Sequence, residues 1–255
     1  MNGALALVGS GEYLPVMQNL EQSLLDNAKN LGKKNTYIQI PTAAGQESDE
    51  RLSFWKTLGG AQAERMRTQQ IFLPIYTRED AMNEAFANQI KDAGLIYLSG
   101  GDPGYLANTL TDTPVWSAIE TAWQSGSSLA GCSAGAMAMG KHVPNFFRPK
   151  EDGTEGFGLI GEIRTIPHYN KFFGWIPDAA ARKLLTAPVG TTVIGIDEST
   201  ALVTGLNDDP DVSFENNSWR VHGEGHVHLL RGEGVQAHKF AHGEVVTLYF
   251  RFDQL

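Results

Sequence analysis

Up to about residue 200, short apolar runs alternate with longer segments in which apolar residues recur at helical spacing. A strand that is covered on both faces needs a nearly continuous apolar run, so each run predicts a strand of a parallel sheet. The predicted strands are residues 4–8, 37–40, 71–75, 95–98, 129–132 and 193–196. Alternating strands and helices predict a mostly parallel sheet with right-handed crossovers and helices on both faces.

Three of the intervening segments predict amphipathic helices. The first has Pro15 in position to open it, because the fixed backbone of proline suits the first turn of a helix. Its apolar face consists of Leu20, Leu24, Ala28 and Leu31. Residues 80–92 and 114–124 predict two further helices, and the second begins with a proline.

Beyond residue 200, the apolar segments are separated by Gly, Asn and Asp, which predicts antiparallel strands that extend one edge of the sheet. These strands are residues 201–204, 218–221, 226–230, 235–240 and 245–250. We find no linker, repeat or low-complexity tract in the sequence. Residues 1–255 are therefore predicted to form a single α/β domain whose last part, from about residue 200, is a β-rich edge region.

Ser133 carries the strongest chemical signal in the sequence. It is the central residue of Gly-Cys-Ser-Ala-Gly at 131–135, between a predicted strand and a helical run. Glycines two residues to either side leave room for a sharp strand-to-helix turn, the nucleophile elbow. The same turn places the Ala134 N–H at a helix N-terminus, where it can stabilise an oxyanion. Ser133 is therefore the candidate nucleophile.

Other polar residues follow neighbouring strands, whose carboxyl ends meet at one edge of a parallel sheet. Gly101, in the glycine-rich turn at 99–104, is a candidate for a second oxyanion donor. His168 follows the predicted strand 162–166 and could take the serine proton. Either Asp197 or Glu198, at the end of another strand, could orient the imidazole of His168.

Four motifs together resemble serine peptidase family S51, which includes aspartyl dipeptidase and cyanophycinase. They are YLSGGD at 97–102, GCSAGAMAMG at 131–140, IPHYNKF at 166–172 and GIDESTAL at 195–202. Residues 219–232, WRVHGEGHVHLLRG, also resemble the closing β segment of amidotransferase-like relatives of that family. The resemblance implies the class I glutamine amidotransferase-like fold, a three-layer flavodoxin-like arrangement.

The resemblance also implies a function and its residues. It implies a serine-type peptidase or amidase that cleaves an amide bond of a small peptide or amino-acid conjugate, without a cofactor or metal. The catalytic triad would be Ser133, His168 and Glu198, an order that differs from the Ser-Asp-His order of α/β-hydrolases. Substrate-binding candidates beside the motifs are Asp102, Tyr169 and Asn170. Glu151, in a polar loop, competes with Glu198 for the third place in the triad.

The sequence departs from the family at three places. Cys132 stands where the family commonly has Thr, and Ile166 with Pro167 replaces the Asp-Gln pair of cyanophycinases. The arginine-rich stretch that follows the histidine in cyanophycinases is absent from residues 169–175. We therefore expect hydrolysis of small peptides or amide conjugates rather than of cyanophycin. Candidates to bind an acidic side chain of a substrate are Arg148, Arg164 and Arg182.

Two alternative functions stay open at this point. The chain could be a binding protein that keeps the fold and the site without turnover. It could also be an amidotransferase-like enzyme that uses Cys132, although the elbow places this thiol one residue into the strand and pointing elsewhere.

Composition removes several other classes of function. A formal net charge of −9 and the absence of a Lys/Arg run argue against nucleic-acid binding. A single cysteine excludes an internal disulfide, and no stretch approaches the roughly 18 apolar residues of a membrane span. We therefore expect a cytoplasmic protein with no membrane partner, and a homodimer stays open. The loop Gly9-Ser10-Gly11 lacks the third glycine of a dinucleotide motif.

Five C-terminal histidines lie within 21 residues of one another. They are His222, His226, His228, His238 and His242. Their glycine-rich strand context does not match the zinc-binding helix motif, so no metal site is predicted.

Overall fold

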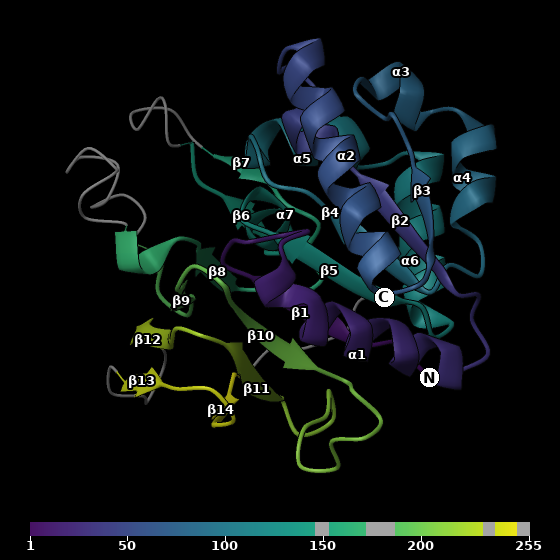
Figure 1. The fold of residues 1–255 in the computed structure, drawn as a ribbon. Helices are drawn as coiled ribbons and strands as arrows, with labels where there is room; N and C mark the ends of the chain where they lie inside the picture. Colours follow the sequence, from purple (N-terminus) through teal and green to yellow (C-terminus); the bar gives the residue numbers. More distant parts are fainter. Residues whose placement is uncertain (146–152, 172–186, 232–237, 249–255) are drawn as a thin grey trace.

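We describe the protein from a computed structural model, in which residues 1–145, 153–171, 187–231 and 238–248 are described. Its larger sheet has eight strands in the order β14-β11-β10-β1-β5-β4-β2-β3 (Figure 1). The parallel strands are β1 (Leu5–Val8), β2 (Thr36–Ile40), β3 (Gln69–Phe72), β4 (Leu95–Leu98) and β5 (Ser128–Cys132). The antiparallel edge strands are β10 (Thr200–Thr204), β11 (Ser218–Gly223) and β14 (Val245–Thr247).

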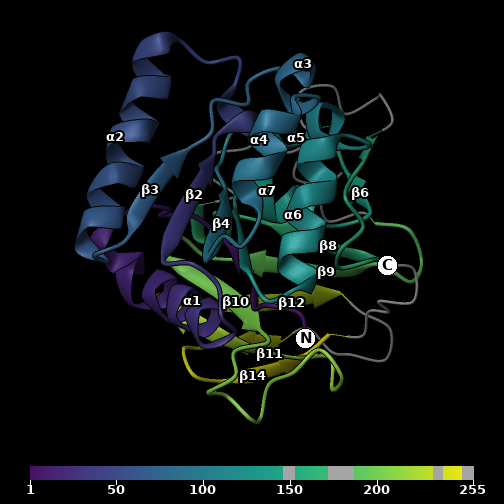
Figure 2. The ribbon, with the colours of Figure 1, turned by 90° about the vertical axis from the view of Figure 1, so that its right-hand side faces the viewer.

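Helices cover both faces of this sheet, which makes a three-layer α/β fold (Figure 2). One face carries α1 (Gln18–Asn30) and α2 (Asp49–Arg65). The other carries α4 (Glu84–Ile90), α5 (Pro103–Leu110) and α6 (Pro114–Gln124). Side chains of β1 alternate between the two cores, since successive residues of a strand point to opposite faces. The remaining short elements up to residue 155 are η1 (Pro15–Met17), η2 (Thr42–Ala44), α3 (Arg78–Ala81), α7 (Ala134–Ala138), β6 (His142–Val143) and β7 (Thr154–Glu155).

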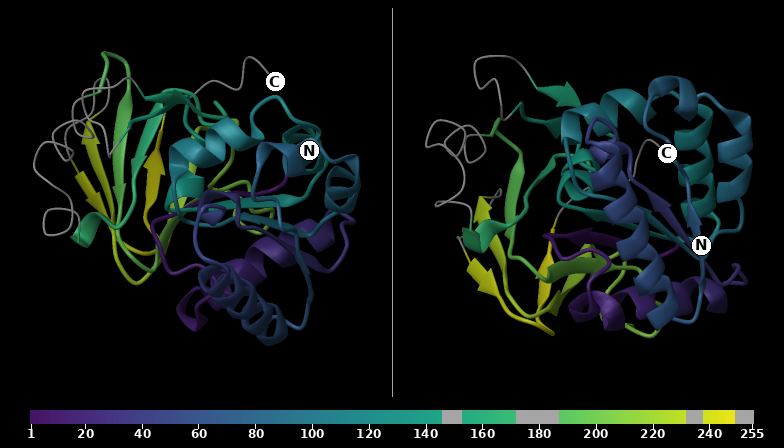
Figure 3. Two further views of the ribbon diagram at one scale, coloured as in Figure 1. Left: turned by 90° about the horizontal axis from the view of Figure 1, so that it is seen from above. Right: turned by 45° about the horizontal axis from the view of Figure 1, so that its top comes forward.

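A second sheet stands beside the first one (Figure 3). Its strands are β8 (Ile163–Ile166), β9 (Thr192–Ile196), β12 (Val227–Arg231) and β13 (His238–Phe240), in the order β13-β12-β9-β8. β8 and β9 are parallel, and β12 is antiparallel to both β9 and β13. The 3-10 turn η3 (Tyr169–Lys171) follows β8.

The assignment of residues 193–196 to the main parallel sheet was wrong, because β9 belongs to this second sheet. After β9 the chain turns tightly at residues 197–199, and Ser199 has a φ of 53°. β10 then pairs antiparallel with β1 and occupies the edge that a further parallel strand would need. Only part of the predicted C-terminal strands extends the main sheet, because β12 pairs with β9 in the second sheet and β13 pairs with β12.

The prediction of one continuous helix over residues 80–92 is also wrong. The structure has α3 and α4 there, with a break at Asn83. The Asn83 side chain accepts a hydrogen bond from the Ala85 N–H at 2.9 Å and so caps a new helix start. The helix at 114–124 has the predicted bounds, and Pro15 lies in η1, which leads into α1. In the part of the chain that the structure describes, no helix has the length and apolar character needed to span a bilayer.

Candidate active site

Ser133 lies between β5 and α7 in a backbone conformation that residues other than glycine rarely adopt. Its φ is 50° and its ψ is −105°. Two backbone hydrogen bonds hold it there, from the Ser133 N–H to the Val8 carbonyl at 2.9 Å and from the Met137 N–H to the Ser133 carbonyl at 3.0 Å. Such strained residues cluster at functional sites.

The two glycines of the motif are required by close packing around this turn. A Cβ on Gly131 would lie 2.6 Å from the carbonyl carbon of Gly135, and a Cβ on Gly135 would lie 2.5 Å from the Leu98 carbonyl oxygen. These distances are shorter than any normal Cβ contact. The spacing that predicted the elbow therefore has a direct steric cause.

The glycine-rich loop after β4 lies against the elbow. A Cβ on Gly100 would lie 3.5 Å from the Ser133 Cβ. The Gly100 N–H donates to Glu12 at 3.0 Å, and the Asp102 N–H donates to the Ala43 carbonyl at 2.8 Å. Among the described residues, the Gly101 N–H between them has no hydrogen-bond acceptor, so it is the amide of this loop that could bind a ligand.

His168 and Glu198 contact each other at the ends of β8 and β9. The distance from His168 Nδ1 to Glu198 Oε1 is 3.1 Å. Because a carboxylate can only accept, this contact assigns the proton of the neutral imidazole to Nδ1. The Asn170 side chain accepts from the Glu198 N–H at 3.1 Å, and the Lys171 ammonium lies 3.8 Å from the second carboxylate oxygen. The acid is therefore held by several groups.

Gly9 brings the turn that carries Glu198 against the end of β1. It follows β1, the parallel neighbour of β5. The Gly9 N–H donates to the Thr200 carbonyl at 2.8 Å, and a Cβ on Gly9 would lie 2.2 Å from the Asp197 carbonyl oxygen. This close approach, which requires glycine, places the turn at 197–199 beside the carboxyl end of β1.

Asp197, the other candidate acid, binds a different histidine. Its carboxylate is buried, 3.0 Å from His228 Nε2 and 3.0 Å from the His226 N–H, and 3.6 Å from His226 Nδ1. Among the described residues, no group of three or more Cys, His, Asp or Glu side chains is arranged to hold a metal ion. Glu151 lies outside the described residues, so its place relative to His168 stays open.

The three predicted substrate-binding residues have structural contacts of their own. The Asp102 carboxylate caps α5 by accepting from the Tyr105 N–H at 2.8 Å. The Tyr169 ring packs on the His228 ring with centroids 4.5 Å apart, and burial and Asp197 raise the pKa of its hydroxyl. Asn170 holds the Glu198 backbone, as described above. A role for these residues in binding substrate stays a prediction, as does one for Arg164; Arg148 and Arg182 lie outside the described residues.

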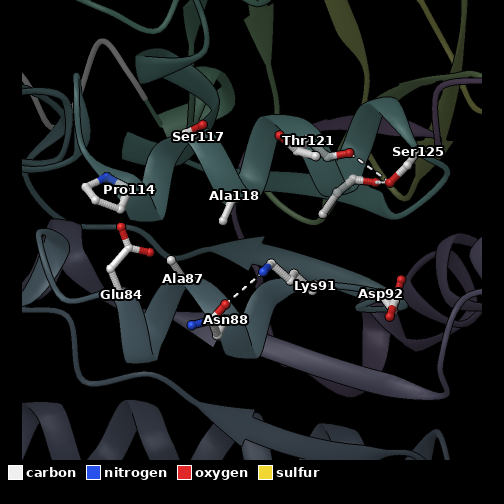
Figure 4. Close-up of a pocket in the computed structure, with 11 residues that line it drawn as sticks. Glu84, Ala87, Asn88, Lys91, Asp92, Pro114, Ser117, Ala118, Thr121 and Ser125 are labelled. Atoms are coloured by element: carbon white, nitrogen blue, oxygen red, sulfur yellow. Dashed lines mark hydrogen bonds between the residues drawn. The ribbon is translucent and has the colours of Figure 1, made fainter.

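Two cavities are lined by described residues. One of about 240 Å³ is lined by Asp102 and by other polar residues of α5, β7 and the neighbouring loops, namely Gln46, Asn108, Asn145 and Thr154. Another, of about 420 Å³, lies between α4 and α6, where the Lys91 ammonium donates to Asn88 at 2.8 Å (Figure 4). None of the three candidate catalytic residues lines either cavity.

Sequence reasoning missed Glu12, which lies in the loop after β1. Its side chain is buried, with one oxygen 3.0 Å from the Gly100 N–H and the other 2.8 Å from Cys132 Sγ. The Cys132 thiol is fully buried, and burial and the Glu12 carboxylate raise its pKa well above the ordinary value. The available signal is its position just past the end of a predicted strand, in the loop that lacks the third glycine of a dinucleotide motif.

Comparisons with known proteins show which proteins this chain resembles in sequence and in fold. The chain is 50% identical to a peptidase from an acI-B1 Actinobacterium whose crystal structure superposes with a TM-score of 0.90, covering 97% of this chain and 98% of that one. It is 29% identical over 216 residues to the cyanophycinase of Trichormus variabilis (strain ATCC 29413 / PCC 7937), which covers 78% of this chain. It is 25% identical over 179 residues to the cyanophycinase of Synechococcus elongatus, which covers 66% of this chain. The matches span 64% and 51% of those two cyanophycinases.

The model of peptidase family S51 matches residues 5–208, a span that contains the elbow, His168 and Glu198. With four ordered motifs and a closely superposing peptidase structure as well, the chain belongs to peptidase family S51.

Proposed function

We propose that the protein is a serine-type peptidase or amidase that cleaves an amide bond of a small peptide or amino-acid conjugate. The observation that carries this proposal is the strained backbone of Ser133 between β5 and α7, with glycines on both sides that leave no room for a Cβ. The His168–Glu198 contact at 3.1 Å supplies a base that an acid orients.

In the proposed reaction, the Ser133 hydroxyl attacks the amide carbonyl carbon while His168 Nε2 takes its proton. The oxyanion accepts hydrogen bonds from the Ala134 and Gly101 N–H groups. His168 then protonates the leaving amine, the C–N bond breaks and an acyl-enzyme remains. Water, deprotonated by His168, attacks the ester and releases the acid, and Ser133 regains its proton. Glu198 orients His168 and stabilises the imidazolium.

A thiol mechanism is less well supported. Cys132 is fully buried, donates its hydrogen bond to Glu12 and has a raised pKa, so it stays protonated at neutral pH. A thiolate is the reactive form of cysteine, and this environment disfavours it.

The test is labelling with a fluorophosphonate, followed by peptide mapping, together with assays on a panel of dipeptides and aminoacyl p-nitroanilides. We expect the label on Ser133, no turnover in Ser133→Ala, and most of the activity retained in Cys132→Ser. Alanine keeps the Cβ of serine, so Ser133→Ala adds no strain to the turn. Turnover by Ser133→Ala together with its loss in Cys132→Ser would establish the thiol mechanism instead. A folded wild type that is neither labelled nor active would be a binding protein.

Substrate choice follows from the residues before His168. The curated relatives are cyanophycinases. The family resemblance implies that Ile166 and Pro167 stand here in place of the Asp-Gln pair of cyanophycinases. We therefore expect faster release of amine from dipeptides than of β-aspartyl-arginine from cyanophycin granules. Efficient degradation of the granules would show that the polar pair is dispensable.

A further inference from the structure

Glu12 links the carboxyl ends of three adjacent strands. It follows β1, its Oε1 accepts from the Gly100 N–H at 3.0 Å after β4, and its Oε2 accepts from the Cys132 thiol at 2.8 Å at the end of β5. The residue is only 7% exposed. Burying a carboxylate is costly unless it is hydrogen-bonded, so these two contacts identify what the group is there to hold.

The loop that Glu12 holds is the one beside the nucleophile. A Cβ on Gly100 would lie 2.8 Å from Glu12 Oε1 and 3.5 Å from the Ser133 Cβ, so the carboxylate, the loop and the elbow lie side by side. Gly100 and Gly101 are free to adopt many backbone conformations, and Gly101 has a φ of 141°. A fixed acceptor for the Gly100 N–H sets the direction of the next amide, which is the proposed oxyanion donor.

Cys132 completes the same arrangement from the other side. The thiol stays protonated because burial and Glu12 raise its pKa, and it therefore serves as a donor to the carboxylate. Its backbone leads directly into Ser133. The residue type that departs from the family thus supplies the same kind of donor that a hydroxyl would supply.

We infer that Glu12 is a positioning residue that fixes the Gly100–Gly101 loop, and with it the oxyanion donor, relative to Ser133. The inference rests on the proposed function, since it concerns the same site. Glu12 acts through the Gly100 amide and does not itself take up the serine proton.

The test compares Glu12→Ala and Glu12→Gln with a matched control, Glu21→Gln. Glu21 is a second buried carboxylate of the same core, which accepts hydrogen bonds from Tyr37, from Gln62 and from the Tyr13 N–H rather than from Gly100. The readouts are the rate of Ser133 labelling by a fluorophosphonate, kcat and KM on a dipeptide that the wild type cleaves, and thermal unfolding of each variant.

For Glu12→Ala we expect kcat and the labelling rate to fall about 100-fold with KM within about threefold, as when an oxyanion donor is lost. Glu12→Gln keeps one oxygen that can accept from Gly100, so it should lose about tenfold. Glu21→Gln should keep the wild-type kcat. Cys132→Ser should resemble the wild type, whereas Cys132→Val, which lacks a donor, should lose several-fold in kcat.

A folded Glu12→Ala with kcat and labelling within threefold of the wild type would overturn the inference. So would a loss of kcat in Glu21→Gln equal to that in Glu12→Ala, since the effect would then follow general loss of core structure. If Glu12→Ala does not fold, the other two variants decide. Wild-type kcat and labelling rate in both folded Glu12→Gln and folded Cys132→Val would then overturn the inference. Failure of the wild type to label at Ser133 refutes the proposed function and is recognised without any Glu12 variant.

Discussion

At the scale of single residues, Ser133 shows how the surroundings of one residue maintain an unfavourable backbone. Conformations of this kind cost roughly 1 to 3 kcal/mol and persist only where neighbouring structure imposes them. Here the imposing contacts are the hydrogen bonds to Val8 and from Met137. The resulting turn lies between β5 and α7, whereas His168 and Glu198 follow β8 and β9 of the second sheet.

Glu198→Gln should lower kcat by roughly 10² to 10⁴, because the imidazole loses its anionic partner while the oxyanion donors remain. Steady-state kinetics on one dipeptide measure this effect. Glu151→Gln serves as the control and should cost less than about tenfold. The opposite ranking of the two variants would transfer the role of triad acid to Glu151.

Dialysis against EDTA should leave turnover unchanged, because the proposed reaction uses a protein base and backbone donors only. His226 and His228 both lie near Asp197, which makes that group the place to look if the expectation fails. Activity that disappears on dialysis and returns with Zn²⁺ would contradict the mechanism.

At the scale of elements, the strands and helices differ in how far the sequence could determine them. β4, β5 and α6 have the predicted positions because each has a strong local pattern: a buried apolar run, or a proline-led amphipathic segment. The partner of β9 could not be predicted in this way, since a buried run looks the same in either sheet. What decides its sheet is the long-range pairing of β10 with β1.

The residues of the candidate site also differ in how far the sequence could predict them. Ser133 and its glycines could be predicted because the turn has a recognisable pattern of five consecutive residues, although one of the steric demands behind it comes from Leu98 in β4. The choice between Asp197 and Glu198 as the partner of His168 could not be made from the residues alone, because adjacent side chains of a turn point in different directions. The family resemblance favoured Glu198. Glu12 was missed because its two partners are 88 and 120 residues away in the sequence.

Gly135→Ala should destabilise the strand-to-helix turn by about 2 kcal/mol or more, since the new Cβ would meet the Leu98 carbonyl oxygen at 2.5 Å. Gly104→Ala is the matched control in α5. Its Cβ would have ordinary contacts, the nearest at 3.4 Å to Asp102, so it should be neutral or add up to about 1 kcal/mol. Thermal unfolding of both variants tests this, and equal midpoints would contradict it.

At the scale of the whole molecule, a buried network of polar side chains lies beneath the site on the α1 face of the sheet. Glu21 accepts hydrogen bonds from Tyr37 at 3.1 Å and from Gln62 at 2.9 Å. Burial raises the pKa of Glu21 from 4.5 to about 7, and its hydrogen bonds only partly oppose this rise. The folded protein therefore holds this proton more tightly than the unfolded chain does.

The free energy of unfolding should consequently fall as pH rises from about 4.5 to about 7, and this contribution should level off above pH 7. At about 1.36 kcal/mol per pKa unit, Glu21 accounts for a loss of about 3 kcal/mol over that range. Glu21→Gln should remove this part of the pH dependence. Urea denaturation of both proteins at several pH values measures the difference, and parallel curves would contradict the assignment.

Because the structure has two sheets, turnover should depend strongly on how these sheets pack against each other. In the proposed triad the nucleophile belongs to the eight-stranded sheet, whereas the base and the acid belong to the four-stranded sheet. Contacts such as that of Gly9 with the Asp197 carbonyl fix the position of one sheet relative to the other. A slight separation of the sheets would disconnect Ser133 from His168 while leaving every strand paired. Turnover should thus disappear under mild denaturant before far-ultraviolet circular dichroism records any loss of secondary structure.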